Sequence, residues 1–498
     1  MDPDYKSRKE AFVSNLTGGS ILEINAVTLV APASVFLWSV LQSRLSFFTP
    51  YGPAALVTDF LLNVLAILFA TTLYSSAPWL LNVLLISPAV LILLNSRSRR
   101  TQTKAKPPQT AALQHGSGAP VSSLPIHPFL TTYRATMMII TCIAILAVDF
   151  RVFPRRFAKA ENWGSSLMDL GVGSFVFSGG VVSARSVLKS RESGTSSKRT
   201  LKQRFTSSIR HSIPLLILGF IRLYSVKNLD YAEHVTEYGV HWNFFFTLGL
   251  LPPFVEIFEG VATLIPSYEA LSLGVAVLYQ VALESTDLKS YILVSPRGAD
   301  LLSKNREGVF SFLGYLAIFL AGRATGIRII PNGTSPLTTP QQARKRVLTS
   351  AAVQTLGCVA LYVLNSTYFL GYGANIPVSR RLANMPYVLW VASFNNAQLF
   401  LFCLIETLLF PSVHRAPASA KNEEAERTGF ATSPIMKAFN RGGLAIFLVA
   451  NLLTGGVNLT VPTLDVNDAQ AMLILVGYAA VITGIALGLD KANIKLTL

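Results

Sequence analysis

Long apolar runs, separated by shorter polar stretches, recur along almost the whole chain. An apolar run of about 20 residues crosses a bilayer as an α-helix, because the helix satisfies its own backbone N–H and C=O groups. The pattern predicts about 13 spans: 24–41, 55–74, 79–94, 132–150, 166–187, 213–226, 242–258, 261–283, 309–321, 351–370, 387–410, 444–457 and 471–489. The runs that begin at 166, 213 and 309 are the weakest, since they are short or broken by Gly and Ser. The expected fold class is an all-α, polytopic transmembrane helical bundle, with 1–498 as a single membrane domain.

Composition agrees with this fold class. The 498 residues are 51% hydrophobic and 14% charged, and the mean hydropathy is +0.46, which is typical of a chain in a lipid bilayer. The formal net charge of +16 is spread between the spans and follows no nucleic-acid-binding motif. Cys142, Cys358 and Cys403 each lie inside an apolar run, so their spacing predicts neither a disulfide framework nor a metal site.

Basic stretches between the spans predict the sidedness of the chain. The stretches 96–130 and 186–211 are rich in Lys and Arg and poor in acids. Such residues concentrate in cytosolic loops, so both stretches are expected to be cytosolic linkers, and 411–441 falls on the same face by the span count. Counting spans outward from these linkers predicts a luminal N-terminus and a cytosolic C-terminus.

One segment that this count makes luminal contradicts the positive-inside rule. It places the cations Arg151, Arg155, Arg156 and Lys159 beside the aromatic residues Phe150, Phe153, Phe157 and Trp163. Pro154 prevents the preceding helix from continuing, so the segment is expected to lie along the membrane surface. Arg155 and Arg156 are suited to bidentate contacts with a phosphate, and Phe153, Phe157 and Trp163 are predicted to help bind the same substrate. The alternative is that these cations snorkel and only anchor the chain at the headgroups.

Asp149 and Lys159 are the candidate catalytic residues of this segment. Asp149 ends an apolar run, and an ionisable group at the hydrocarbon boundary is a functional candidate by default. After a turn at Pro154, Lys159 can fold back toward it. The carboxylate could accept a proton from an alcohol, and the ammonium could stabilise negative charge on a thioester oxygen. The alternative is a structural ion pair.

Asp169 and His241 are two further candidates for substrate binding. Asp169 lies in a Gly-rich predicted span, where small residues let helices approach closely, and the favoured interpretation is a packing or polar-network residue. His241 lies beside aromatic residues at a predicted luminal edge, and a headgroup contact is favoured over catalysis for it.

Four stretches of the sequence resemble one known family. They are KEAFVSNLTGGSILEINAV, AVDFRVFPRRFAKAENWGSSLMDLGVGSFVFSGG, NREGVFSFLGYLAIFLAG and SRRLANMPYVLWVASFNNAQLF. Together they resemble the fungal GPI-anchored wall transfer proteins and their animal counterpart PIG-W. Because the stretches begin near residue 10 and end at 400, the resemblance covers most of the chain.

The resemblance implies an O-acyltransferase of GPI-anchor biosynthesis in the endoplasmic reticulum membrane. The implied reaction moves an acyl chain from acyl-CoA, with palmitoyl-CoA as the expected cosubstrate, to the inositol ring of glucosaminyl-phosphatidylinositol. Asp149 and Lys159 are carried over as its catalytic pair. The expected partners are these two substrates and the bilayer, with no bound cofactor, no nucleic acid and no obligate protein partner.

Two other classes of function remain open from the sequence. An ion-coupled secondary transporter also has many spans, broken helices and an intramembrane Asp, but it predicts charges near the middle of spans, whereas most charges here lie at span ends. A scaffold subunit of a membrane complex is the third possibility.

Overall fold

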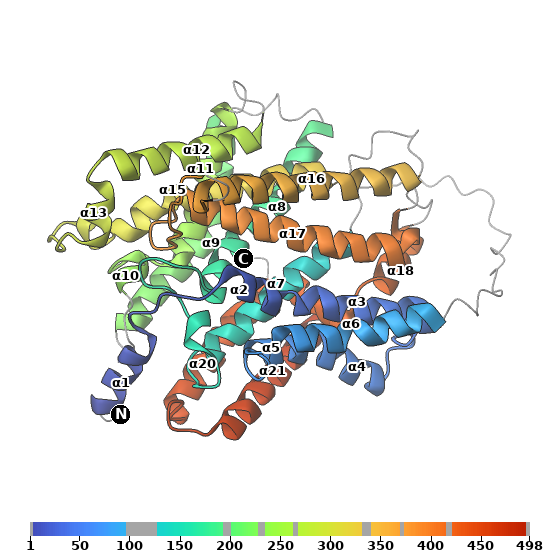
Figure 1. Cartoon of the computed structure of the whole chain (residues 1–498). Helices are drawn as coiled ribbons and strands as arrows, with labels where there is room; N and C mark the ends of the chain where they lie inside the picture. The colour runs from blue at the N-terminus through green and yellow to red at the C-terminus, as the bar shows by residue number, and fades with distance from the viewer. Residues whose placement is uncertain are drawn as a thin grey trace.

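The computed structural model describes residues 3–95, 127–192, 201–227, 235–261, 267–330, 340–368, 373–414 and 421–494, and it is a bundle of helices (Figure 1). Among the described residues, ten helical stretches are long and apolar enough to cross a membrane. They are α2 (Ile21–Thr28) with α3 (Val30–Leu45), α4 (Pro53–Phe60) with η1 (Leu61–Leu65) and α5 (Ala66–Thr71), α6 (Pro78–Asn95), α7 (Pro128–Ala147), α8 (Leu167–Glu192), α15 (Arg306–Ile329), α16 (Pro340–Ser366), α17 (Met385–Leu409), α20 (Gly443–Thr460) and α21 (Asp468–Lys491). The chain is therefore an all-α, multi-pass membrane protein, which confirms the predicted fold class.

The other three predicted spans are also helical. They correspond to α9 (Leu201–Lys227), α11 (Phe244–Val261) and α12 (Tyr268–Ser285), of which α9 and α11 contain shorter apolar stretches. Short helices lie between the long ones: α1 (Pro3–Val13), η3 (Arg155–Phe157), α10 (Val235–Tyr238), α13 (Leu288–Leu293), α14 (Leu301–Lys304), η5 (Pro411–His414), α18 (Lys421–Phe430) and α19 (Pro434–Arg441).

Some helix ends differ from the predicted spans. The weak run 309–321 is only the centre of α15, which continues to Ile329 because its polar residues are buried against other helices. The predicted start of the span 261–283 is wrong, since Val261 ends α11 and α12 begins at Tyr268. Ser267 defines that beginning by accepting a hydrogen bond from the backbone N–H of Ala270, as an N-cap does.

The three predicted linkers are described only in part. Residues 96–126 and 193–200 lie outside the described residues. The flanks of the second linker, 186–192 and 201–211, continue α8 and α9 as helix. The third linker, 411–441, contains α18 and α19, and Ser433 caps α19 by accepting a hydrogen bond from the Met436 N–H.

One end of the bundle carries the segment 149–166, which joins α7 to α8, and we call this end the motif side. Lys9 of α1 contacts Asn458 near the C-terminal end of α20, whereas Asn493, just after α21, contacts Arg441 just before α20 begins. The two contacts lie at opposite ends of α20. Helix α1 and the end of α21 therefore lie at opposite ends of the bundle, while the compartment that each end faces remains a prediction.

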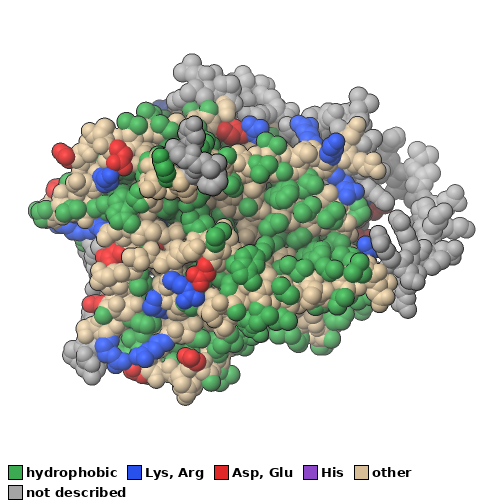
Figure 2. Space-filling view, viewed as in Figure 1, with side chains coloured by type: hydrophobic (Ala, Val, Ile, Leu, Met, Phe, Trp, Pro, Cys, Tyr) green, Lys and Arg blue, Asp and Glu red, His purple; other side chains and the backbone are tan. Residues whose placement is uncertain are grey.

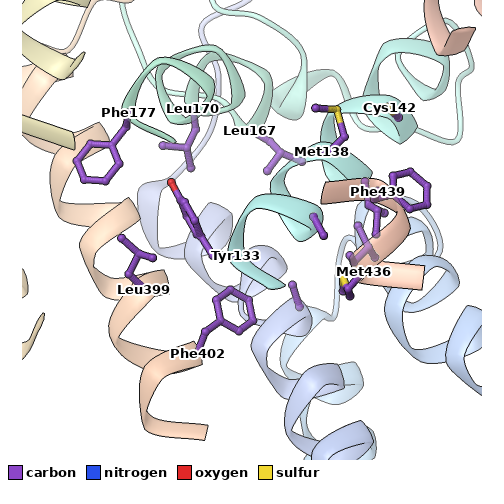
Figure 3. Packing of buried hydrophobic residues seen from close by; sticks show 14 of the residues in the cluster. Tyr133, Met138, Cys142, Leu167, Leu170, Phe177, Leu399, Phe402, Met436 and Phe439 are labelled. Carbon is purple, nitrogen blue, oxygen red and sulfur yellow. The ribbon is translucent and has the colours of Figure 1, made fainter. Parts of the chain in front are cut away.

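The helices α8 and α15 pack closely at the centre of the bundle because small residues face each other. A Cβ at Gly180 would lie 2.1 Å from the carbonyl oxygen of Phe319, and one at Gly322 would lie 2.1 Å from that of Phe177. Only glycine fits at this distance, as at many membrane helix interfaces. The neighbouring core between α7, α8 and α17 is filled by side chains such as Tyr133 and Phe402 (Figure 3).

The outer surface of the long helices is apolar, as a lipid-facing surface requires. On α6 the exposed side chains include Leu80, Val83, Leu84 and Leu91. Figure 2 shows hydrophobic side chains over the face where Figure 1 places α3, α6, α16 and α17. Such a patch would be exceptional on a soluble monomer.

Candidate active site

The segment 149–166 is fixed to the N-terminal part of the chain by backbone contacts. The N–H of Gly19 donates to the carbonyl of Ser165 over 2.8 Å, and the N–H of Glu161 donates to the carbonyl of Leu16 over 2.9 Å. Gly18 and Gly164 have φ angles of +77° and +119°, and a Cβ at either would lie within about 2 Å of the opposite backbone. Two of the stretches quoted from the sequence therefore form one surface.

Asp149 lies two residues beyond the end of α7 and is held by α1 and α20. The Nδ2 of Asn458 donates to its Oδ2 over 2.7 Å, and the Nζ of Lys9 lies 3.8 Å from its Oδ1. Lys9 also donates to the Oδ1 of Asn458 over 2.6 Å. The Asp149 side chain keeps 13% of its surface exposed, so it is ordered by neighbours but reachable from the surface.

Lys159 has a different partner from the one predicted for it. Its Nζ lies 2.6 Å from Oε1 of Glu237 on α10, and its side chain is 37% exposed. The turn at η3 directs the chain from Asp149 toward α10, so the ion pairs of Asp149 and Lys159 go to separate partners among the described residues. A direct Asp149–Lys159 ion pair is therefore not the arrangement in this structure, and a shared catalytic role stays a prediction.

The two predicted phosphate ligands, Arg155 and Arg156, lie in different surroundings. One Nη of Arg155 donates to the carbonyls of Val148, Phe150 and Phe153, and its guanidinium stacks 3.8 Å above the Phe12 ring. These contacts close the turn after α7. Burial lowers the pKa of Arg155 to about 10, and the nearby Asp149 carboxylate acts in the opposite direction.

Arg156 is the more accessible of the two arginines. It donates to Oε1 of Glu23 over 2.7 Å, and its side chain is 38% exposed. A guanidinium with this much exposed surface can exchange or share its carboxylate partner with a phosphate. Arg156 is thus the better placed of the two for the predicted phosphate contact.

The predicted aromatic substrate contacts mostly hold the segment in the core. Phe153 and Phe157 are fully buried and pack edge to face at 5.9 Å. Trp163 is partly buried beside a small cluster that includes Tyr279 and Leu382. In this structure the two Phe rings face the core and not the surface where a headgroup would bind.

Asp169 is fully buried in the first turn of α8. Its Oδ2 accepts hydrogen bonds from the Ala160 N–H over 2.9 Å and from the Ser166 hydroxyl over 2.7 Å. Its Oδ1 lies 3.8 Å from Nε of Arg380, and its own carbonyl accepts from the Tyr387 hydroxyl. Asp169 therefore ties α8 to the segment before it and to the beginning of α17.

The contacts of His241 involve a different part of the chain, the beginning of α15. Its backbone N–H donates to Oδ1 of Asn305 over 2.8 Å, and so does that of Trp242. These bonds fix the turn before α11 against the beginning of α15. The imidazole of His241 is half-buried, and its predicted headgroup contact stays a prediction.

A cavity of about 40 Å³ lies between α2, α7, α8 and α17. Its lining includes Leu167 and Leu170 of α8, Tyr133 of α7 and Phe402 of α17, whose side chains are labelled in Figure 3. The Tyr133 hydroxyl donates to Oδ1 of Asn395 over 2.7 Å beside it. Within the part of the chain that is described, no group of three His, Cys, Asp or Glu side chains is placed to hold a metal ion.

Comparison with known proteins decides the family. Residues 5–489 match the GWT1 family. The chain belongs to the GWT1 family. It is 84% identical over 498 residues to GPI-anchored wall transfer protein 1 of Emericella nidulans, and both chains are covered completely. Proteins of the same name from Gibberella zeae and Candida albicans are 57% identical over 501 residues and 40% identical over 520 residues, with 99% and 100% of both chains covered.

Four polar residues of this GWT1-family site were not among the sequence predictions: Lys9, Glu237, Arg380 and Asn458. Lys9 and Arg380 lie inside two of the stretches that carry the family resemblance, so those stretches could have pointed to them. Asn458 lies in an apolar helix, where a polar side chain is itself a signal. Glu237 follows seven residues outside the described ranges, and nothing in its sequence surroundings marks it.

Proposed function

We propose that this chain is an O-acyltransferase of GPI-anchor biosynthesis. It transfers an acyl chain from acyl-CoA to the inositol ring of glucosaminyl-phosphatidylinositol. The observation that carries the proposal is an accessible carboxylate, Asp149, and an accessible ammonium, Lys159, in one short segment at a membrane boundary of a GWT1-family chain. Acyl transfer to an alcohol needs a base and a stabiliser of negative charge, and these two groups supply them.

The proposed reaction assigns one step to each group. The Asp149 carboxylate accepts the proton of the inositol hydroxyl as that oxygen attacks the thioester carbonyl carbon. The Lys159 ammonium donates a hydrogen bond to the carbonyl oxygen while it carries negative charge. The C–S bond then breaks, the coenzyme A thiolate leaves and takes up a proton, and an inositol ester remains.

Two further contacts with the substrates are proposed, one by the exposed Arg156 and one in the apolar cavity. Arg156 is exposed enough to meet the phosphate of the phosphoinositide. The cavity between α2, α7, α8 and α17 is lined mostly by apolar side chains, among them Leu167 and Leu170 beside Asp169 in the sequence, and at about 40 Å³ it would have to widen to hold part of an acyl chain. The motif side faces the lumen of the endoplasmic reticulum in this proposal, so α1 is luminal and the end of α21 is cytosolic.

A reconstitution assay tests the proposed function. Purified protein in lipid vesicles, given glucosaminyl-phosphatidylinositol and labelled palmitoyl-CoA, should produce a labelled inositol ester that chromatography separates. Protein without either substrate is the control. Absence of labelled product from folded, purified protein would contradict the proposal and return attention to a transporter or a scaffold subunit.

A further inference from the structure

Lys159 is the outermost member of a row of alternating charges that runs into the bundle. Its Nζ lies 2.6 Å from Oε1 of Glu237, and the other carboxylate oxygen of Glu237 lies 3.5 Å from an Nη of Arg380. The Nε of Arg380 lies 3.8 Å from Oδ1 of Asp169. The four groups come from the segment after α7, from α10, from the segment before α17 and from α8.

Exposure decreases steadily along this row. The side chain of Lys159 is 37% exposed, that of Glu237 is 17% exposed, that of Arg380 is 3% exposed, and that of Asp169 is fully buried. Buried ionic groups keep their geometry only when each has a partner. The buried inner members are therefore the most firmly ordered, and each one restricts the position of its neighbour nearer the surface.

Glu237 is also held from its buried side, by contacts that do not involve Lys159. The same Nη of Arg380 that faces Glu237 donates to the hydroxyl of Tyr238 over 2.8 Å, and the guanidinium lies 5.0 Å from the centre of the Tyr238 ring. Glu237 and Tyr238 are neighbours on α10, so Arg380 holds that short helix at two adjacent side chains. An exposed ion pair is usually weak because both side chains must be ordered, but here one of them is already ordered.

We propose that Glu237 is a positioning residue for the acyl transfer reaction and acts through Lys159. Lysine has a flexible four-carbon stem, and a preordered carboxylate at 2.6 Å restricts where its ammonium lies. Arg380 and Tyr238 hold Glu237 in turn. This inference rests on the proposed function, since it assumes that the ammonium of Lys159 meets the thioester oxygen.

The proposal is tested by Glu237→Gln, which keeps the shape and removes the charge. We expect kcat to fall by roughly tenfold, with the KM of each substrate within about twofold of wild type, because positioning acts on the transition state. Glu161→Gln is the matched control. Glu161 is a carboxylate two residues from Lys159 that accepts a hydrogen bond from the Asn15 N–H, and its substitution should leave kcat unchanged.

A double-mutant cycle separates positioning from general support of the fold. If Glu237 acts through Lys159, Glu237→Gln should have no further effect on kcat in a Lys159→Ala background. The unfolding temperature of each variant is measured beside kcat. If Glu237→Gln lowers that temperature, Glu237→Asp replaces it, since this variant keeps the charge but shortens the reach, and it should still lower kcat.

A second measurement does not depend on acyl transfer. The intact protein is treated with a water-soluble amine-reactive ester, and the labelling rate of Lys159 is followed by peptide mass spectrometry. Loss of the Glu237 carboxylate should raise that rate by roughly threefold or more, while Glu161→Gln should not change it. Unchanged labelling, a normal kcat or an equal loss of kcat in the Lys159→Ala background would each overturn the proposal. Failure of wild-type protein to transfer acyl chains would instead refute the proposed function, and the labelling would still show whether Glu237 holds Lys159.

Discussion

Asp149 and Asp169 lie twenty residues apart, at the end of one helix and the beginning of the next, yet their surroundings differ. The Asp149 carboxylate is 13% exposed and contacts the side chains of Lys9 and Asn458, which come from distant parts of the chain. The Asp169 carboxylate is fully buried, with two hydrogen bonds from its own segment and a buried guanidinium, that of Arg380, beside it. Both carboxylates lie at the motif side.

The difference shows why an unusual charge in a membrane protein needs its surroundings before it is given a role. A sealed carboxylate cannot take a proton from a substrate without a large rearrangement, and removing it leaves a buried cation unpaired. A partly exposed carboxylate can exchange one neighbour for a substrate at little cost in stability. Asp149 therefore suits chemistry, and Asp169 suits the joining of helices.

The largest expected effect is the loss of turnover in Asp149→Asn. This change keeps the size of the side chain and removes the base, so kcat should fall by roughly 10²- to 10⁴-fold. The unfolding temperature should stay near that of wild type, because an amide can still pair with Asn458 at this partly exposed position. The reconstituted acylation assay and a thermal unfolding curve measure both quantities. A folded variant with near-normal kcat would remove Asp149 from the mechanism.

The second expected effect is a loss of stability in Asp169→Ala. The substitution leaves the guanidinium of Arg380 buried without this partner, and breaking a buried pair from one side costs about 3–5 kcal/mol. Folded yield and unfolding temperature should both drop, and the double variant Asp169→Ala with Arg380→Met should recover part of the loss. A stable Asp169→Ala protein that folds normally but has no activity would reverse the comparison between the two carboxylates.

The third prediction applies the same contrast to Arg155 and Arg156. Arg156→Gln should raise the KM for the phosphoinositide by roughly tenfold, because a charge-assisted hydrogen bond to phosphate is lost, and should leave the KM for acyl-CoA nearly unchanged. Arg155→Gln should instead lower stability by about 1–3 kcal/mol through its lost contacts to three carbonyls. Kinetics with each substrate varied in turn, together with unfolding curves, separate the two. Equal changes in the two KM values for Arg156→Gln would argue against direct phosphate contact.

The fold was more predictable than the site, for a physical reason. The helical class and the approximate positions of the long helices follow from local hydropathy, since each run of apolar residues must satisfy its own backbone in lipid. Hydropathy counted about 13 spans, of which ten are long and apolar enough among the described residues. The pairing of Asp149 depends instead on residues about 140 positions before and 309 positions after it, at Lys9 and Asn458. Because Lys159 is close to Asp149 along the chain, the sequence favoured it as the partner of Asp149. In the structure, Lys159 follows the turn at η3 and pairs with Glu237 instead.

The arginines show the same limit of local reasoning. Paired guanidinium groups beside aromatic residues predict a phosphate site, and that interpretation treats Arg155 and Arg156 alike. The helix that ends at Ala147 leaves carbonyl groups without partners inside the helix, and Arg155 contacts one of them, that of Val148, together with two in the following turn. Which of two adjacent arginines faces inward is decided by tertiary packing, here the Phe12 ring from α1.

The smallest expected effect is that of Lys9→Gln, which tests whether α1 belongs to the site. Lys9 lies 3.8 Å from Oδ1 of Asp149 and donates to Asn458, and its side chain is 21% exposed. Because Asn458 continues to donate to the Asp149 carboxylate, the base stays in place and loses only one neighbouring charge. Ion pairs with partly exposed members contribute little, so kcat should fall by roughly two- to fivefold, with unfolding temperature unchanged. Arg8→Gln is the matched control, since Arg8 pairs with Asp465 at the surface of the same helix and should leave kcat as it is. A loss for Lys9→Gln as large as that for Asp149→Asn would mean that Lys9, and not Lys159, is the cation on which the Asp149 chemistry depends.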